Sequence, residues 1–300
     1  MLKQIKNSID NTINQTYTVN PWTNVYGLSR TFLALSLLVN LIFTGHTYLF
    51  PTNNNIQLRQ LIFDFEKVSI FSVLDKNIHL ACIISIIILL MTITGYLPQI
   101  TGILHWYITY SYMTSSILIE GGDQIAAILT LLLIPVTLTD NRINHWHKQR
   151  NSDRKKTKML IWSIYFIITL QISIIYFHAA IAKLFSKEWL NGTATYYWFT
   201  HNIFGVSEYL KFLIQPFLSN SFIVVSLTWG TIIFEIILFG WLFMKRNLWN
   251  WKLLFLLGVL FHFSIAFIHG LISFMLTMIG ALILYLIPKN KDLKLKIWKQ

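Results

Sequence analysis

One lysine is the first residue of this chain whose position could do chemistry. Lys183 stands in the stretch YFHAAIAKLFSKEW, residues 176–189, at the end of a long apolar run that starts near Met159. A lysine in an apolar pocket has a depressed pKa and can act as a base. The alternative is a lysine at a helix end that extends its ammonium to the membrane surface. Ala179 and Ala180, one turn below Lys183, leave space beside the ammonium and favour the pocket.

Further polar residues are expected near Lys183. The stretch LIEGGDQIAA places Glu120 and Asp123 at a turn between two apolar runs, and its two glycines let the backbone turn tightly. His178 lies about one and a half turns below Lys183. We expect Glu120, Asp123, Lys183 and His269 to meet in one pocket that faces outward.

Two opposite charges stand inside apolar runs. Arg30 lies about five residues into the first run, and Glu235 lies about fifteen residues into a later one. At about 1.5 Å per residue both come to a similar depth near the cytoplasmic side. Charges within a membrane are costly and usually paired or functional. The pattern predicts a structural ion pair between Arg30 and Glu235, and a role in proton movement is the alternative.

Two histidines share one face of a predicted helix. His262 is near mid-membrane, and His269 follows seven residues later at the outer end. A lone intramembrane histidine is usually a hydrogen-bonded packing group. Two on one stripe keep a catalytic role open for both.

The elements that must position these residues are membrane-spanning helices. The chain has 300 residues, of which 55% are hydrophobic and only 12% charged, more apolar surface than a soluble domain of this length can bury. We predict an all-α integral membrane protein, a polytopic bundle of about eight transmembrane helices. The single cysteine, Cys82, excludes an internal disulfide, and no metal-type spacing of Cys and His occurs. The predicted spans are 25–49, 78–97, 100–118, 122–139, 159–183, 220–244, 252–268 and 270–287.

The distribution of positive charge predicts the orientation. Seventeen of the 24 basic residues fall on the side of the bundle that carries both termini, and six fall on the other side. By the positive-inside rule both termini are then cytoplasmic. The net charge of +12 is explained by this asymmetry, so nucleic-acid binding is not expected. A single helix over 252–287 is the main competing topology.

The spans and their connections are predicted to form one domain, 1–300. Its cytoplasmic parts include an N-terminal segment, 1–24, and a solvated loop, 140–158, beside anionic lipid head groups. Its long external segments are 50–77 and 184–219. Within the latter, SEYLKFLIQPFL at 207–218 is typical of an amphipathic helix at the membrane surface.

Two stretches resemble known families. NPWTNVYGLSRTFLALSLL, residues 20–38, closely resembles the opening of the sporulation-delaying protein B family. AAIAKLFSKEWLNGTATYY, residues 179–197, resembles the membrane part of vitamin K-dependent gamma-carboxylases. The two groups share the horizontally transferred transmembrane domain, and the resemblance covers nearly the whole chain.

The resemblance implies roles for individual residues. Lys183 matches the second lysine of a carboxylase pair, the base that activates reduced vitamin K, whereas the first position of the pair is Ala182. Trp189 and Gly192 match the residues that follow. Asp123 stands where the carboxylases have a histidine. His262 falls on a histidine of the superfamily, and Glu235 falls near an acidic position of the preceding helix.

The resemblance also implies a function. We expect a bacterial plasma-membrane protein that matures or activates an exported antimicrobial peptide toxin, with a toxin precursor and a small accessory protein of the same locus as partners. A gamma-carboxylase-like enzyme acting on a peptide is one form of this role, and a membrane quinol is a cofactor by analogy. Asp123 and the short tail after the last span argue against glutamate carboxylation itself. The alternatives are a non-catalytic membrane chaperone or export module and, with less support, a proton-coupled transporter.

The orientation can be tested with an impermeant thiol reagent on intact cells. Cysteines at Asn54 and Asn202 should react because both lie in predicted external segments. A cysteine at Ser152 should react only after the membrane is opened. Labelling at Ser152 alone in intact cells would reverse the predicted orientation.

Overall fold

The structure is a computed structural model. It describes residues 19–50, 65–148, 153–244, 248–290 and 292–293. Much of the predicted external segment 50–77, part of the loop 140–158, most of the segment 1–24 and the end of the chain therefore lie outside the described residues.

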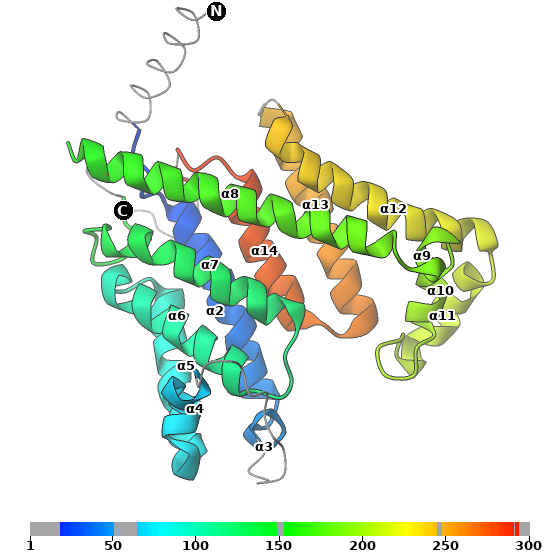
Figure 1. Ribbon diagram of the computed structural model, residues 1–300, viewed down its shortest axis with the longest axis horizontal. Coiled ribbons are helices and arrows are strands. Elements are labelled where there is room, and N and C mark those ends of the chain that lie inside the picture. Colours follow the sequence, from blue (N-terminus) through cyan, green and yellow to red (C-terminus); the bar gives the residue numbers. More distant parts are fainter. Residues whose placement is uncertain (1–18, 51–64, 149–152, 245–247, 291, 294–300) are drawn as a thin grey trace, which may run out of the picture.

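The described residues form helices and no β-strand, apart from one isolated bridge between Tyr96 and Asn144. Eight long helices form the body of the molecule (Figure 1). They are α2 (Asn24–Phe43), α5 (Ile78–Thr94), α6 (Pro98–Ser115), α7 (Gly121–Leu138), α8 (Lys155–Lys183), α12 (Ser221–Gly240), α13 (Leu248–His269) and α14 (Ile272–Leu286).

Short helices form the connections. Four lie between α2 and α5, namely α3 (His46–Leu49), η1 (Phe65–Val68), α4 (Ile70–Val73) and η2 (Asp75–Asn77). Three lie between α8 and α12, namely α9 (Lys187–Leu190), α10 (Ala194–Phe199) and α11 (Glu208–Leu218). The short η3 (Trp241–Phe243) follows α12. The predicted amphipathic segment 207–218 is thus helix α11.

Each predicted span corresponds to one long helix. Six helical segments, those of α2, α5, α7, α8, α12 and α13, are long and apolar enough to cross a membrane. Together they indicate a multi-pass membrane protein. The other two helices, α6 and α14, do not meet that criterion: α14 has 15 residues, and α6 is rich in Tyr, Thr and Ser. The first helix is shorter than predicted because it ends at Phe43, before Gly45.

The apolar stretch near the C-terminal end forms two helices. Helix α13 ends at His269, and Gly270 has a φ of 73°, in the left-handed region that glycine adopts most easily. Its N–H donates to Ala266 O at 2.8 Å, and α14 begins two residues later. The predicted break at His269 and Gly270 is therefore confirmed, and a single helix over 252–287 is wrong.

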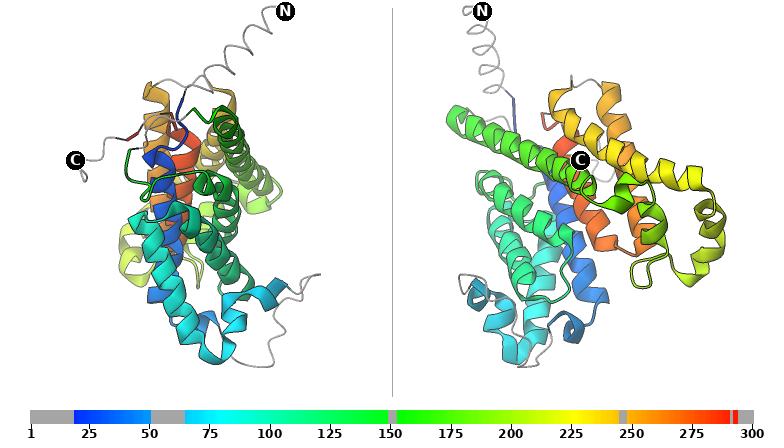
Figure 2. Two further views of the ribbon diagram at one scale, coloured as in Figure 1. Left: turned by 90° about the vertical axis from the view of Figure 1, so that its left-hand side faces the viewer. Right: turned by 45° about the vertical axis from the view of Figure 1, so that its right-hand side comes forward.

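Helix α14 lies at the centre of the bundle, and the three views place it between α2 and α13 (Figures 1 and 2). All its residues from Thr277 to Leu286 are buried. A side chain at Gly280 would come within 3.1–3.2 Å of Leu33 and of Ser29 O, and Ser29 Oγ donates to Gly280 O at 2.8 Å. A small residue here permits the close approach of α2 and α14, as is common between membrane helices.

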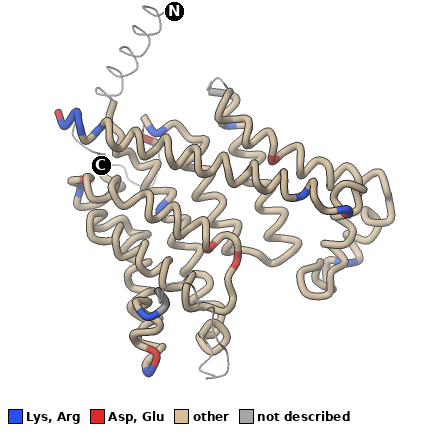
Figure 3. Tube along the Cα trace, viewed as in Figure 1, with Lys and Arg blue, Asp and Glu red and all other residues tan. Residues whose placement is uncertain are grey.

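The two ends of the described chain meet on one side of the bundle. Asn24 accepts from Leu293 N at 2.7 Å and donates to Leu293 O at 2.9 Å, and its own N–H donates to Asp292 at 2.9 Å. Both ends of the described chain thus lie on one side of the bundle. Most Lys, Arg, Asp and Glu positions among the described residues lie toward the helix ends (Figure 3).

The close contact of α2 with α14 predicts a stability effect. Gly280→Val should lower the thermal midpoint of the purified protein, because overpacking a tight contact costs about 1–3 kcal/mol. Gly230→Val is the matched control, since a side chain at that position on α12 meets nothing within 4 Å. Equal losses in both variants would mean that helix propensity, and not the contact, sets the effect.

Candidate functional site

A cavity of about 650 Å³ lies between α8, α12, α13 and the connecting helices α9–α11. Its walls are mainly aromatic and aliphatic, including Trp198, Phe199, Phe217 and Phe261. Lys183, Trp189, Glu235 and His269 also line it. Helix α10 is fixed against α12 because Thr195 and Thr228 share a hydrogen bond of 2.9 Å.

An ion pair forms the polar centre of this cavity. Lys183 Nζ lies 2.7 and 2.9 Å from the two carboxylate oxygens of Glu235. The side chains are 20% and 7% exposed, respectively. The pair joins the C-terminal end of α8 to the C-terminal half of α12, and these helices run side by side (Figure 1).

The contacts of Lys183 are those of an ammonium group. Besides the two Glu235 oxygens, Nζ donates to Ala179 O at 3.2 Å, so each of its three N–H groups has an acceptor. The nitrogen also lies 5.1 Å from the centre of the Trp189 ring, within the range of a cation–π interaction. We predicted that Ala180 leaves space beside Lys183, but Ala180 is fully buried and does not line the cavity. The open space beside Lys183 is the cavity itself.

The expected pair of Arg30 with Glu235 is replaced by other partners. The guanidinium of Arg30 is buried and lies 2.9 Å from Thr101 Oγ1 and 3.2 Å from His145 Nδ1. Helix α2 turns this side chain toward α6, whereas α12 turns Glu235 toward α8. Counting residues placed Arg30 and Glu235 at one height near the cytoplasmic side, but Glu235 contacts Lys183, which the same counting placed at the opposite side. Counting also did not determine which way each helix faces.

Glu120 and Asp123 lie outside the cavity lining. Asp123 accepts from Glu120 N at 2.8 Å, and Glu120 accepts from Ser273 Oγ at 3.0 Å. The two carboxylates begin helix α7 in a capping box and connect it to α14. Of the four residues predicted to meet in one pocket, only Lys183 and His269 line the cavity. The carboxylates of Glu120 and Asp123 instead accept hydrogen bonds at the start of α7.

His269 stands at the rim of the cavity. Its Nδ1 lies 2.5 Å from Phe204 O, and its ring makes an edge contact with Phe199 at a centroid distance of 5.7 Å. His262, seven residues earlier, is buried in the core, where Nε2 lies 3.0 Å from Tyr176 OH. His178 is exposed and contacts Phe177. Neither His178 nor His262 lines the cavity described above.

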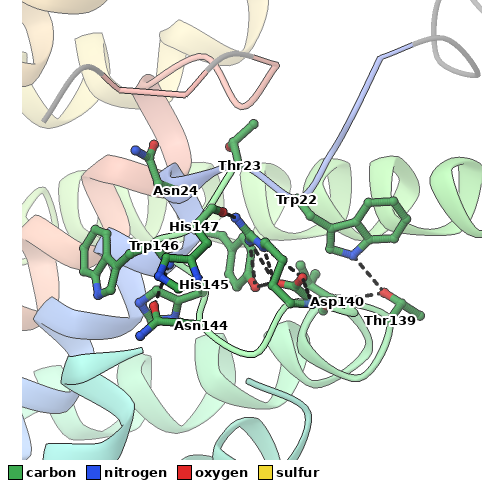
Figure 4. Close-up of polar contacts among 12 residues, drawn as sticks. Trp22, Thr23, Asn24, Thr139, Asp140, Asn144, His145, Trp146 and His147 are labelled. Carbon is green, nitrogen blue, oxygen red and sulfur yellow. Dashed lines mark hydrogen bonds and ion pairs between the residues drawn. The ribbon is translucent and has the colours of Figure 1, made fainter. Parts of the chain in front are cut away.

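A second polar cluster, which sequence reasoning missed, lies on the side of both chain ends (Figure 4). Asp140 is fully buried and accepts from Arg142 Nη2 at 2.8 Å and from Arg142 Nε at 2.9 Å. Tyr26 OH also donates to Asp140. His145 lies beside Arg30, and burial, together with the charges of Arg30 and Arg142, holds the pKa of His145 well below its ordinary value.

This cluster corrects the prediction of a solvated loop over 140–158. His145 is completely buried, and Asn144 donates to Thr94 O at 2.9 Å. Trp22 contacts the residue directly before this loop, because its Nε1 donates to Thr139 Oγ1 at 3.1 Å (Figure 4). The start of the loop is therefore packed against α2 and α5. Arg142 stands in a polar stretch, which is typical of a solvated loop. The only sequence signal for the cluster was the acidic residue Asp140, two positions before Arg142.

Two proteins of Bacillus subtilis (strain 168) are similar to this chain over most of their length. The uncharacterized protein YitO is 38% identical over 299 residues, which is 98% of this chain and 94% of YitO. The sporulation-delaying protein SdpB is 38% identical over 291 residues, which is 97% of this chain and 88% of SdpB. No protein-family model matches the chain. No solved structure matches it either.

Such identity over nearly the full length of both chains confirms the resemblance carried by residues 20–38. The chain belongs to the family of the sporulation-delaying protein SdpB.

Proposed function

We propose that this protein is a bacterial plasma-membrane component that matures or activates an exported antimicrobial peptide toxin, and that the cavity around Lys183 binds the peptide. The relationship to the sporulation-delaying protein SdpB supports the pathway. One structural observation carries the site: an apolar cavity of about 650 Å³ with a lysine–glutamate pair at its polar centre.

The walls of the cavity fit an apolar peptide segment. Binding pockets for organic ligands typically measure about 300–1,000 Å³ and combine apolar walls with a few placed polar groups. Phe199, Phe217 and Phe261 supply such walls here. Gly230 leaves open space on the α12 side, because no atom lies within 4 Å of where its side chain would begin.

The ion pair gives the cavity a chemical capacity. A paired lysine and glutamate seldom stabilise an apolar site more than hydrophobic residues of the same size would. Intramembrane charges are accordingly associated with function. The Lys183 ammonium, held by Glu235, can stabilise negative charge that develops on a bound peptide during proton transfer. This role replaces that of Lys183 as the base, since its three N–H groups already have acceptors.

A quinol, implied only by analogy, fits the cavity in part. Trp198 and Phe199 would contact its ring. Its two hydroxyl groups, at opposite ends of the ring, each need a partner. Lys183 and Glu235 already bind each other, so a quinol hydroxyl would have to compete with this ion pair or use another polar residue of the lining, such as Ser226 or Ser264. The proposed reaction therefore takes no step through a quinol.

The second candidate function is a non-catalytic chaperone or export module. The predominance of aromatic and aliphatic side chains in the lining favours it, because such walls hold an apolar peptide without changing it. Mass spectrometry of peptides exported by cells with and without this protein separates the two. A mass change that depends on the protein supports maturation. Loss of the exported peptide without any mass change supports the chaperone.

The ion pair predicts a separation of folding from function. Lys183→Met alone should lower the membrane level of the protein, because it leaves the Glu235 charge unpaired. The double variant with Glu235→Met should recover that level but not peptide maturation, which should fall about 10²-fold or more with the loss of charge stabilisation. Lys183→Arg should keep part of the activity because it keeps the cation.

Two outcomes of that experiment would count against charge stabilisation by Lys183. Normal maturation in the double variant would leave the chaperone as the better function. Full loss in Lys183→Arg at a normal protein level would mean that a cation beside Glu235 is insufficient, and would return the base role to the lysine.

The cavity itself predicts the effect of filling it. Gly230→Leu should abolish peptide maturation because its side chain enters the cavity, while the protein level in the membrane stays normal. Gly240→Leu on the same helix is the matched control, since its nearest neighbour lies at 4.0 Å and it does not line the cavity. Exported peptides are compared by mass spectrometry. Unchanged maturation in Gly230→Leu would place the peptide elsewhere.

A further inference from the structure

We infer that Nε2 of His269 accepts the proton that is removed from the bound peptide, while Lys183 stabilises the charge left behind. This inference rests on the proposed function and assigns the base within the same cavity. It is carried by the hydrogen bond between His269 and Phe204, by the place of His269 on the cavity wall and by the contacts of Lys183.

The partner of Nδ1 determines the tautomer of His269. Nδ1 lies 2.5 Å from the backbone oxygen of Phe204. A carbonyl oxygen has no hydrogen to donate, so Nδ1 must carry the proton of this bond. In the neutral imidazole the lone pair is then on Nε2. A histidine oriented by a carbonyl in this way is a common arrangement for a ring whose other nitrogen binds or reacts.

The surroundings hold the ring at the cavity wall. Phe199 meets the ring edge to face, at an angle of 80° between the two planes. Gly270, directly after His269, ends helix α13, so the histidine stands at the last position of the helix. His269 lines the same cavity as Lys183 and Glu235, and it is partly exposed rather than buried. A peptide bound in the cavity would therefore contact the side chain of His269.

The other titratable groups around the cavity are already engaged. Lys183 has acceptors for its three N–H groups, and both oxygens of Glu235 accept from it. His201, on the loop before α11, accepts at Nδ1 from the N–H groups of Ile203 and Phe204. Lys211 on α11 pairs with Glu208. Among these side chains, His269 keeps a ring nitrogen, Nε2, whose lone pair the bond to Phe204 O does not use.

The proton transfer can be written in one step. An X–H bond of the peptide breaks, and its electron pair stays on X. The proton forms a bond with Nε2, so His269 becomes an imidazolium that keeps its Nδ1–H bond to Phe204 O. The negative charge on X is balanced by the Lys183 ammonium. The imidazolium later releases its proton to water outside the cavity.

His269→Asn is the informative variant. The amide nitrogen of asparagine takes a position close to that of Nδ1, and it can still donate to Phe204 O. Asparagine has no basic nitrogen, so maturation of exported peptides should fall about 10²-fold, the usual contribution of a positioned base. The protein level in the membrane and its thermal midpoint should stay normal. Imidazole in the medium should restore part of the activity in His269→Ala, whose smaller side chain leaves room for it.

A pH profile gives an independent readout in intact cells that express the wild-type protein. The rate of maturation, measured between about pH 5 and 8, should rise with pH, because an imidazolium has no lone pair on Nε2 with which to accept a proton. His269→Asn should lose this dependence. A rate that is flat over this range in the wild type would overturn the inference even if the asparagine variant did not accumulate.

The outcomes separate this inference from the proposed function. Normal maturation by His269→Asn, together with its loss in Gly230→Leu, would show that the cavity is the site but that His269 is only a clamp for Phe204. No change of peptide mass in cells that lack the protein would instead reject maturation itself. Loss in His269→Asn without rescue of His269→Ala by imidazole would also reject the histidine as the base.

Discussion

Two charges in a low-dielectric cavity remain charged only while they stay together, and much of this structure follows from that constraint. Separating Lys183 from Glu235 would leave an unpaired charge among aromatic side chains, at a cost of several kcal/mol. The pair therefore fixes how α8 lies against α12. Thr195 and Thr228 add α10 to the same wall. The cavity is the space that remains between these fixed elements and α11 and α13.

The same rule explains the polar cluster on the side of the chain ends. Arg142 and Asp140 are both buried and pair at 2.8 Å, and Tyr26 completes the shell of Asp140. Arg30 has neutral partners, Thr101 and His145. Burial and two nearby guanidinium groups keep the pKa of His145 low, so the imidazole adds no further positive charge to this cluster. The cluster around Asp140 thus holds the helices together on the side of the chain ends. The pair of Lys183 and Glu235 instead lies in the cavity wall.

The positions of the helices could be predicted from the sequence because hydrophobicity along the chain decides them directly. The break at Gly270 and helix α11 were also predictable, because each depends on residues that are close together in the sequence. Lys183 and His269 could be placed at one surface by counting residues. The partner of Lys183 could not, because counting placed Glu235 near the opposite side of the membrane, whereas the folded helices bring the two side chains within 2.7 Å of each other. Asp140 was missed because a loop rich in Lys and Arg has the composition of a solvated one.

The reactivity of the site depends on how its protons are distributed. An ammonium with three acceptors is a poor base, yet it is a fixed positive charge that needs no rearrangement when negative charge appears nearby. An imidazole whose Nδ1–H is committed to a carbonyl is the complementary group, because its lone pair is fixed in direction. Placing both on one apolar cavity divides proton removal and charge stabilisation between α13 and α8. A lysine alone could not do both, because its one nitrogen would need a lone pair to remove the proton and a positive charge to stabilise what is left.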